Sequence, residues 1–147
     1  LANLKVGKYT VKEIMEAMLV PSGNDAAYSL AYYIAKNELG EGYTATEYIN
    51  YFTTELSEYL IEEGYSKTNL YNDPSGASMS ADTHLDDINR VALKLYNYDF
   101  VKECVGKSTF LSLRSGILPA EMQCRLRLLH SRSESYRLNL RCCIFLL

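Results

Sequence analysis

The sequence predicts a mostly α-helical body at residues 1–110, followed by a compositionally different tail at residues 111–147. Two observations predict the helices: apolar residues recur at a spacing of about 3.6, and two of the apolar runs open with Thr and Glu three residues apart, as in a capping box. The tail is set apart by its charge. The body holds nine Lys and Arg against sixteen Asp and Glu, a net charge of −7, whereas the tail holds six Arg against two acids, a net charge of +4.

The first predicted helix begins at residue 11 and ends before Pro21. Thr10 and Glu13 have the spacing of a capping box, in which each side chain accepts a hydrogen bond from the other residue's backbone N–H. Since the residue before a proline is biased away from helical dihedrals, this helix should end at or before Val20. Its apolar stripe consists of Val11, Ile14, Met15, Met18 and Leu19.

The second predicted helix follows Asp25 and is closed by Gly40 and Gly42, because glycine commonly ends helices. One face of this helix holds mostly small apolar residues, namely Ala26, Ala27, Leu30, Ala31, Ile34 and Ala35. Because the distance between packed helices depends on the side chains at the contact, small residues allow close approach. We therefore expect this helix to lie at the centre of the body.

The third predicted helix begins after Thr44, which has capping-box spacing to Glu47, and ends before Gly64. Its inward-facing residues are expected to be Ile49, Phe52, Leu56 and Leu60. Residues 69–80, NLYNDPSGASMS, predict a loop, because Asn, Asp, Pro, Ser and Gly all favour turns.

Thr83 is expected to cap the fourth helix, whose first turn places Asp86 and Asp87 at the positive end of the helix dipole. The apolar residues of this helix are Leu85, Ile88, Val91, Ala92 and Leu95. A short helical segment near 100–104 and one strand near 107–113 complete the predicted elements.

Composition and spacing argue against several kinds of site. No apolar run approaches the roughly 20 residues of a membrane span, and six scattered arginines without interleaved aromatic residues do not predict a nucleic-acid partner. The segment VGKST at 105–109 lacks the first glycine of a phosphate loop, because Val101 stands there. No metal site is predicted, since metal-ligand spacing is absent from the cysteines. Their disulfide state is left open; they are Cys104, Cys124, Cys142 and Cys143.

The ends of the chain suggest an incomplete gene product. The sequence opens on Leu1 rather than Met and carries no signal peptide. The tail at 111–147 could be a second module, an appended segment or translation in a shifted reading frame. We favour the shifted frame as a hypothesis, because the tail also lacks convincing element signals, and we assign it no domain.

Ser22, Gly23 and Asn24 separate the first two predicted helices, in the segment LVPSGNDAA. Backbone donors are unpaired at such a junction, so Asn24 could cap the following helix while Ser22 hydrogen-bonds locally. Spacing alone favours this local structural role. The functional alternative places both side chains in a cleft, where a hydroxyl relays protons and a carboxamide both donates to and accepts from a substrate amide.

The sequence around this junction resembles the D-alanyl-D-alanine carboxypeptidases, which are low-molecular-weight penicillin-binding proteins of the S11 serine-peptidase type. The resemblance runs from about residue 4 to residue 110 and is strongest in LVPSGNDAA. Residues 69–76 are similar to the family's asparagine-proline-x-glycine loop, and residues 80–95 to the helix that follows it. The resemblance implies an α+β parent of the serine β-lactamase/transpeptidase-like fold, in which this fragment is mostly the α-helical subdomain.

That family uses three motifs: S-x-x-K with the nucleophilic serine, S-x-N, and K-T-G. The resemblance implies that Ser22 and Asn24 are the catalytic S-x-N residues and that Gly23 and Asn24 bind substrate. Ser22 would relay the proton that leaves the nucleophile, Asn24 would hold the peptide carbonyl of the substrate, and Gly23 would let the backbone approach its neighbours.

The other two motifs are absent from the chain. No Lys has Ser three residues before it, and Lys67-Thr68-Asn69 lacks the glycine of K-T-G. Because acylation requires the nucleophile, we expect the chain alone to be inactive. Two alternatives stay open: a non-catalytic helical module that binds a cell-wall component or a partner protein, and a class A β-lactamase-like relative. Gly23 argues against the latter, since that class generally has Asp there.

The resemblance also implies partners and a location. The substrate would be a peptidoglycan stem peptide ending in D-Ala-D-Ala, and β-lactams would be captured by the complete parent. No cofactor or metal is implied. The parent would act outside the cytoplasmic membrane, either secreted or attached to its outer face through parts absent from this chain.

Overall fold

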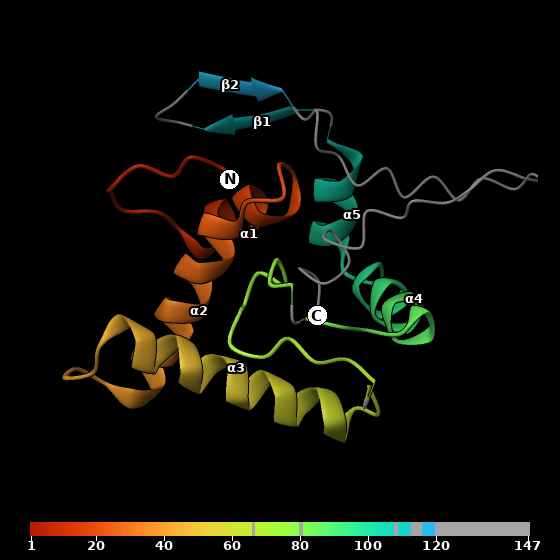
Figure 1. Cartoon of the computed structure of the whole chain (residues 1–147). Helices are drawn as coiled ribbons and strands as arrows, with labels where there is room; N and C mark the ends of the chain where they lie inside the picture. The colour runs from red at the N-terminus through yellow and green to blue at the C-terminus, as the bar shows by residue number, and fades with distance from the viewer. Residues whose placement is uncertain (66, 80, 108, 113–115, 120–147) are drawn as a thin grey trace, which may run out of the picture.

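Five helices and one antiparallel strand pair make up the part of the chain that the structure describes (Figure 1). This computed structural model describes residues 1–65, 67–79, 81–107, 109–112 and 116–119. The helices are α1 (Val11–Leu19), α2 (Asn24–Leu39), α3 (Ala45–Glu62), α4 (Leu85–Leu95) and α5 (Asp99–Gly106). Strand β1 (Thr109–Ser112) pairs with β2 (Gly116–Pro119), with Phe110 opposite Leu118.

The prediction of a mostly helical body is confirmed, and β1 falls within the range 107–113 where a strand was expected. The α+β parent fold stays a prediction. Most of the tail, residues 120–147, lies outside the described residues, as do Cys124, Cys142 and Cys143. The boundary between body and tail therefore also stays a prediction.

Both predicted capping boxes are confirmed. The Glu13 carboxylate accepts a hydrogen bond from the Thr10 backbone N–H at 2.7 Å, and the Thr10 hydroxyl accepts one from the Glu13 N–H at 3.2 Å. Thr44 and Glu47 make the same pair of bonds at the start of α3. Helix α1 ends at Leu19, before Pro21, as the proline predicts.

The predicted cap of α4 is wrong by one residue. His84, not Thr83, occupies the N-cap position, and its Nδ1 accepts from the N–H of Asp86 at 3.5 Å. The Thr83 hydroxyl instead lies 2.8 Å from that of Thr68. A tertiary contact therefore holds the side chain that the local pattern assigned to capping.

The buried face of α3 is broader than the predicted one, since Ile49, Phe52 and Leu56 are partly buried as expected for inward-facing residues. Leu60 is buried as expected, but the other fully buried residues of this helix are Tyr48 and Thr53. The Tyr48 hydroxyl donates to the carbonyl of Gly40 at 2.5 Å, and the Thr53 hydroxyl donates to the carbonyl of Ile49 at 3.0 Å. Both polar groups are thus hydrogen-bonded, which is the condition for burying them.

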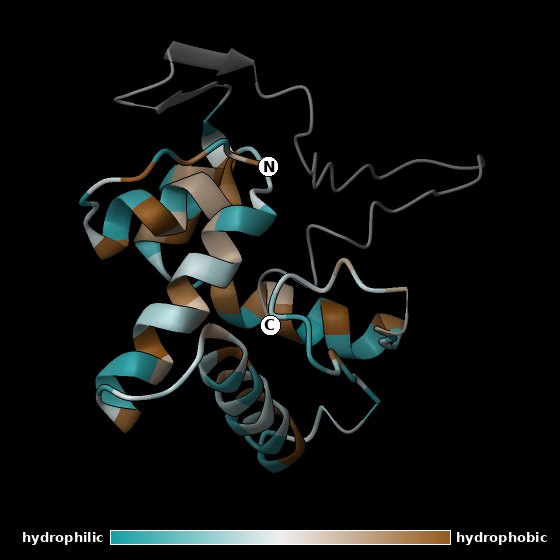
Figure 2. Ribbon diagram, turned by 60° about the vertical axis from the view of Figure 1, so that its left-hand side comes forward, coloured by the Kyte–Doolittle hydropathy of each residue, from teal (hydrophilic) through white to brown (hydrophobic). Residues whose placement is uncertain are grey.

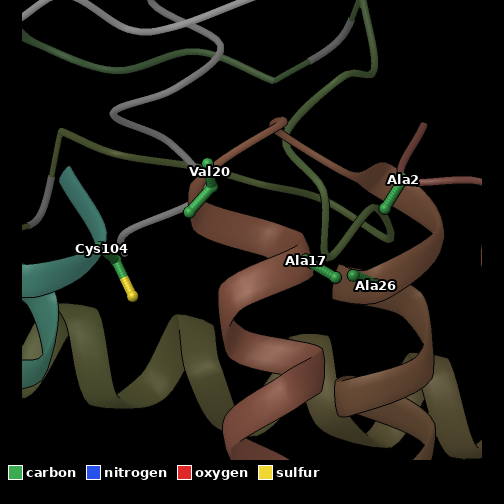
Figure 3. Close-up of a cluster of buried hydrophobic side chains, with 5 residues drawn as sticks. All are labelled: Ala2, Ala17, Val20, Ala26 and Cys104. Atoms are coloured by element: carbon green, nitrogen blue, oxygen red, sulfur yellow. The ribbon is translucent and has the colours of Figure 1, made fainter. Parts of the chain in front are cut away.

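Helix α2 packs against both α1 and α3, so its predicted central position is confirmed. The alanines on its inner face, Ala26, Ala27, Ala31 and Ala35, are all buried. Near the start of α2, Ala26 faces Ala17 of α1, and Cys104 of α5 reaches toward the same cluster (Figure 3). Figure 2 shows hydrophobic residues in brown and hydrophilic residues in teal alternating along the helices, as amphipathic packing requires.

A second cluster joins the end of α3 to α4 and to the loop between them. Its buried residues are Leu60, Tyr65, Leu70 and Val91. Beside them the buried carboxylate of Asp87 accepts hydrogen bonds from the backbone N–H of Lys67 at 3.2 Å and from the Thr68 hydroxyl at 3.0 Å. These bonds fix the start of the loop to α4.

Candidate functional site

The junction between α1 and α2 turns sharply at Ser22. Its backbone φ is 55°, in the left-handed region that few residues with a side chain adopt. This reversal lets the N–H of Gly23 donate back to the carbonyls of Ala17 and Met18, each at 3.2 Å, which satisfies the end of α1. A backbone in this region costs on the order of 1–3 kcal/mol and is enriched at functional sites.

Gly23 is required by packing rather than by backbone conformation. Its φ of −81° is accessible to any residue, but a Cβ at this position would lie 2.6 Å from the carbonyl oxygen of Ala17 and 2.7 Å from the Cβ of Ala2. Both distances are shorter than van der Waals contact. The backbone of the junction therefore lies directly against its neighbours.

The structure does not show the local role that spacing alone favoured, in which Asn24 caps the following helix and Ser22 hydrogen-bonds locally. Gly23 is the N-cap of α2 without any side-chain hydrogen bond, and Asn24 is already the first helical residue. Within the described part of the chain, neither the Ser22 hydroxyl nor the Asn24 carboxamide makes a hydrogen bond. Every fully buried polar side-chain atom there has a partner, so the Ser22 hydroxyl, on a side chain that is otherwise nearly buried, keeps contact with solvent.

Asp25 fastens the N-terminal segment over this junction, a role that sequence reasoning missed. Its two carboxylate oxygens accept hydrogen bonds from the backbone N–H groups of Ala2, at 2.7 Å, and Leu4, at 2.9 Å. Asp25 also lies in the first turn of α2, where the helix dipole favours a negative charge. An acid at that position was the available signal, but its partners lie more than 20 residues away.

Among the described residues, two hollows lie beside α2, and Ser22, Gly23 and Asn24 line neither of them. One, of about 660 Å³, lies between the N-terminal segment and the first two helices; its lining includes Leu4, Val6, Ile14, Asp25, Leu30 and Tyr33. The other, of about 700 Å³, is lined by Tyr28, Tyr71, Asn72, Asp73 and Ser78. The cleft expected beside Ser22 is thus not formed by these two hollows.

No alternative nucleophile adjoins the junction in the described residues. Cys104 is a free thiol of the same cluster, but burial raises its pKa to about 11, so at neutral pH it stays protonated and unreactive. Lys107 of the α5 end pairs with Glu16 and, at 3.1 Å, with Glu103. Hydrogen bonds to these two carboxylates raise the pKa of Lys107, which keeps this amine charged and occupied in joining α5 to α1.

The loop that resembles the asparagine-proline-x-glycine segment is folded back on itself. The Asp73 Oδ1 accepts hydrogen bonds from the backbone N–H of Ser75, at 2.8 Å, and from its hydroxyl, at 2.6 Å. Ser75 is only 1% exposed, so its hydroxyl is a structural group. Gly76 has a φ of 60°, which glycine adopts without strain.

Comparison of the chain with models of protein families, with curated proteins and with solved structures finds no match. Across the described helices, none is both long and apolar enough to span a membrane. In the same part of the chain, no group of His, Cys, Asp and Glu is arranged to hold a metal ion.

Proposed function

We propose that this chain is the helical subdomain of a serine-type D-Ala-D-Ala carboxypeptidase, with Ser22, Gly23 and Asn24 as its S-x-N element. One observation carries the proposal: Ser22, with its strained backbone, and Asn24, two residues later, present a hydroxyl and a carboxamide without partners in the described residues. A chain that needed only a turn could place glycine at 22 without strain. The strain is accounted for if the hydroxyl at this position does chemistry.

In this proposal the two side chains have separate tasks. The Ser22 hydroxyl passes the proton from the nucleophilic serine to the departing D-alanine, since a hydroxyl can accept and donate at once. Asn24 donates from its amide to the carbonyl of the substrate peptide. Gly23 holds the two residues against α1, because any larger residue would push the junction outward.

The proposed parent is an α+β enzyme that acts on peptidoglycan stem peptides and is acylated by β-lactams, outside the cytoplasmic membrane. Its nucleophile and its K-T-G strand are not in these 147 residues. Without the nucleophilic serine, the chain alone is not acylated. No metal or cofactor takes part in the proposed reaction.

A chimera tests this proposal. Residues 1–107, which include the N-terminal segment held by Asp25, would replace the helical subdomain of an intact serine carboxypeptidase, and a fluorescent penicillin would report acylation. We expect labelling of the chimera, a fall of about 10²-fold or more in the labelling rate for Ser22→Ala, and an unchanged rate for Ser29→Ala. Ser29 is the matched control because its hydroxyl only donates to the backbone of its own helix. A folded chimera that labels equally well with Ser22→Ala would contradict the proposal.

The second candidate is a non-catalytic helical module that binds a cell-wall component or a partner protein. It is favoured by the missing motifs and by the hollow of about 700 Å³ that includes Tyr28 and Asp73 in its lining. Binding of muropeptides by the chain, insensitive to Ser22→Ala and Asn24→Ala, would support this reading over the first.

A further inference from the structure

The hollow of about 700 Å³ beside α2 is formed by one helical residue and one loop. Tyr28 comes from α2, and the other lining residues, Tyr71, Asn72, Asp73 and Ser78, come from the loop that precedes α4. In Figure 1 this loop is the yellow-green trace that runs from the end of α3 back toward α2 before it reaches α4. We call these five residues the Tyr28–Asp73 pocket. It shares no residue with the Ser22–Asn24 junction, so the inference does not depend on the proposed function.

The loop is held in shape by its own hydrogen bonds. An antiparallel bridge between Asn69 and Asp82 closes it, with N–H···O distances of 2.9 and 3.0 Å. Leu70 and Ser75 are each 1% exposed and anchor the loop from inside. The walls of the pocket are therefore largely formed before any ligand arrives, which lowers the entropic cost of binding.

Two of the residues that line this pocket are solvent-exposed tyrosines. Tyr28 is 40% exposed and Tyr71 is 48% exposed. Tyr71 has a φ of 52°, which is a strained backbone for a bulky residue, and its N–H donates to the side-chain oxygen of Asn69 at 2.8 Å. An exposed aromatic side chain is thus held at this site by a backbone conformation that is unfavourable for it.

The charge of the pocket is negative. Asp73 supplies a carboxylate, Asn72 an amide and Ser78 a hydroxyl, and none of the described lining residues is a cation. Burial first, and then the charge of Asp73 and hydrogen bonding to it, raise the pKa of Tyr28, so its phenol stays protonated at neutral pH. An anionic ligand would meet this carboxylate without any compensating positive charge.

We propose that the Tyr28–Asp73 pocket binds an organic ammonium group, carried by a small amine or by an amine side chain of a peptide. Aromatic faces attract cations through the quadrupole of the ring, and the Asp73 carboxylate adds a direct ion pair. The lining also includes the Asn72 amide, a polar group that can hydrogen-bond a ligand. The net charge of −7 over residues 1–110 also draws cations toward this part of the chain.

An NMR titration of the chain with ¹³C-labelled tyrosine rings tests the assignment. The probe is butylammonium chloride, and 1-butanol is the uncharged control of similar shape. We expect saturable shifts of the Tyr28 and Tyr71 ring signals, each identified from its Tyr→Phe variant, with the ammonium ion at millimolar concentration. The alcohol should leave both signals nearly unchanged.

Variants separate the charge from the rings. Asp73→Asn keeps an oxygen that can accept from Ser75 and should weaken binding about three- to tenfold. Asp99→Asn is the matched control, because it removes the same charge from a fully exposed site outside the pocket, and should bind as the wild type does. Tyr28→Leu removes one ring together with its hydrogen bond to Asp73, but the bonds from Ser75 to Asp73 within the loop do not involve this residue. This variant should also weaken binding.

Three results would overturn the proposal. The first is that 1-butanol shifts the ring signals as much as butylammonium does. The second is that Asp73→Asn and Tyr28→Leu, both normally folded, bind the ammonium ion with unchanged affinity. The third is that methyl glucoside saturates the same signals at a lower concentration than butylammonium. The last would identify the pocket as a saccharide site instead.

Discussion

Replacing Gly23 by alanine tests how tightly the α1–α2 junction is packed. The added methyl would lie 2.6 Å from the carbonyl oxygen of Ala17 and 2.7 Å from the Cβ of Ala2. The first contact is with backbone, so relief requires α1 and α2 to move apart. Overpacking of this kind costs about 1–3 kcal/mol, and alanine is also a somewhat poorer N-cap than glycine.

We expect Gly23→Ala to lower the free energy of unfolding by about 2 kcal/mol. For a body of this size that corresponds to a fall in Tm of roughly 8–16 °C, measured by circular dichroism at 222 nm. Gly106→Ala is the control, because nothing lies within 4 Å of its added Cβ, and its Tm should not fall. The double variant Ala2→Gly, Gly23→Ala should recover part of the loss, since it removes one of the two short contacts.

A Gly23→Ala protein as stable as the wild type would refute this reasoning. It would mean that α1 and α2 can move apart at the junction at little cost in free energy, and that the close packing of Gly23 does not hold Ser22 and Asn24 in place. The steric argument for glycine in the middle of S-x-N would then fail with it.

Three further predictions concern other features of the described structure. Ser22→Gly should raise the Tm by a few degrees, because glycine adopts a positive φ without strain. The variant would also lack the hydroxyl that the proposed mechanism requires. An unchanged or lower Tm would contradict the conclusion that the Ser22 backbone is strained. Asp87→Ala should lower the free energy of unfolding in urea by about 2–3 kcal/mol, since it leaves two donors at the loop without their acceptor. A loss below about 0.5 kcal/mol would show that the network is dispensable. Hydrogen bonds from the Thr44 backbone and hydroxyl lower the pKa of Glu47. Its contribution to stability is therefore fully present above the ordinary Glu pKa and is lost as the pH falls through the lowered value. Glu47→Gln should have a lower Tm than the wild type at pH 7 and the same Tm at strongly acidic pH.

Features fixed by residues close in sequence could be predicted from the sequence. Both capping boxes depend on side chains three residues apart, and the end of α1 depends on the adjacent Pro21. The buried face of α2 followed from its alanines. In each case the determining contacts lie within one or two helical turns, which is the range that periodicity and capping rules describe.

Features fixed by distant partners could not be predicted. The local sequence predicts Thr83 as a cap, because no nearby residue reveals that the Thr68 hydroxyl lies 2.8 Å from that of Thr83. The apolar pattern of α3 does not predict the burial of Tyr48, because this burial depends on a carbonyl at Gly40 and on the rings of Tyr32 and Tyr43 around it. The candidate site follows the same division: the Ser22–Asn24 turn was visible in the sequence, whereas the strain at Ser22 and the anchor at Asp25 were not.

The central claim is that Asn24 and Ser22 are available to a D-Ala-D-Ala peptide, and the side-chain amide signal of Asn24 reports on it most directly. In an NMR titration of the ¹⁵N-labelled chain with N-acetyl-D-Ala-D-Ala, we expect this signal to shift in a saturable way, and the L-Ala-L-Ala isomer to leave it in place. An Asn24 signal that ignores both peptides, or responds equally to both, would contradict the carboxypeptidase assignment.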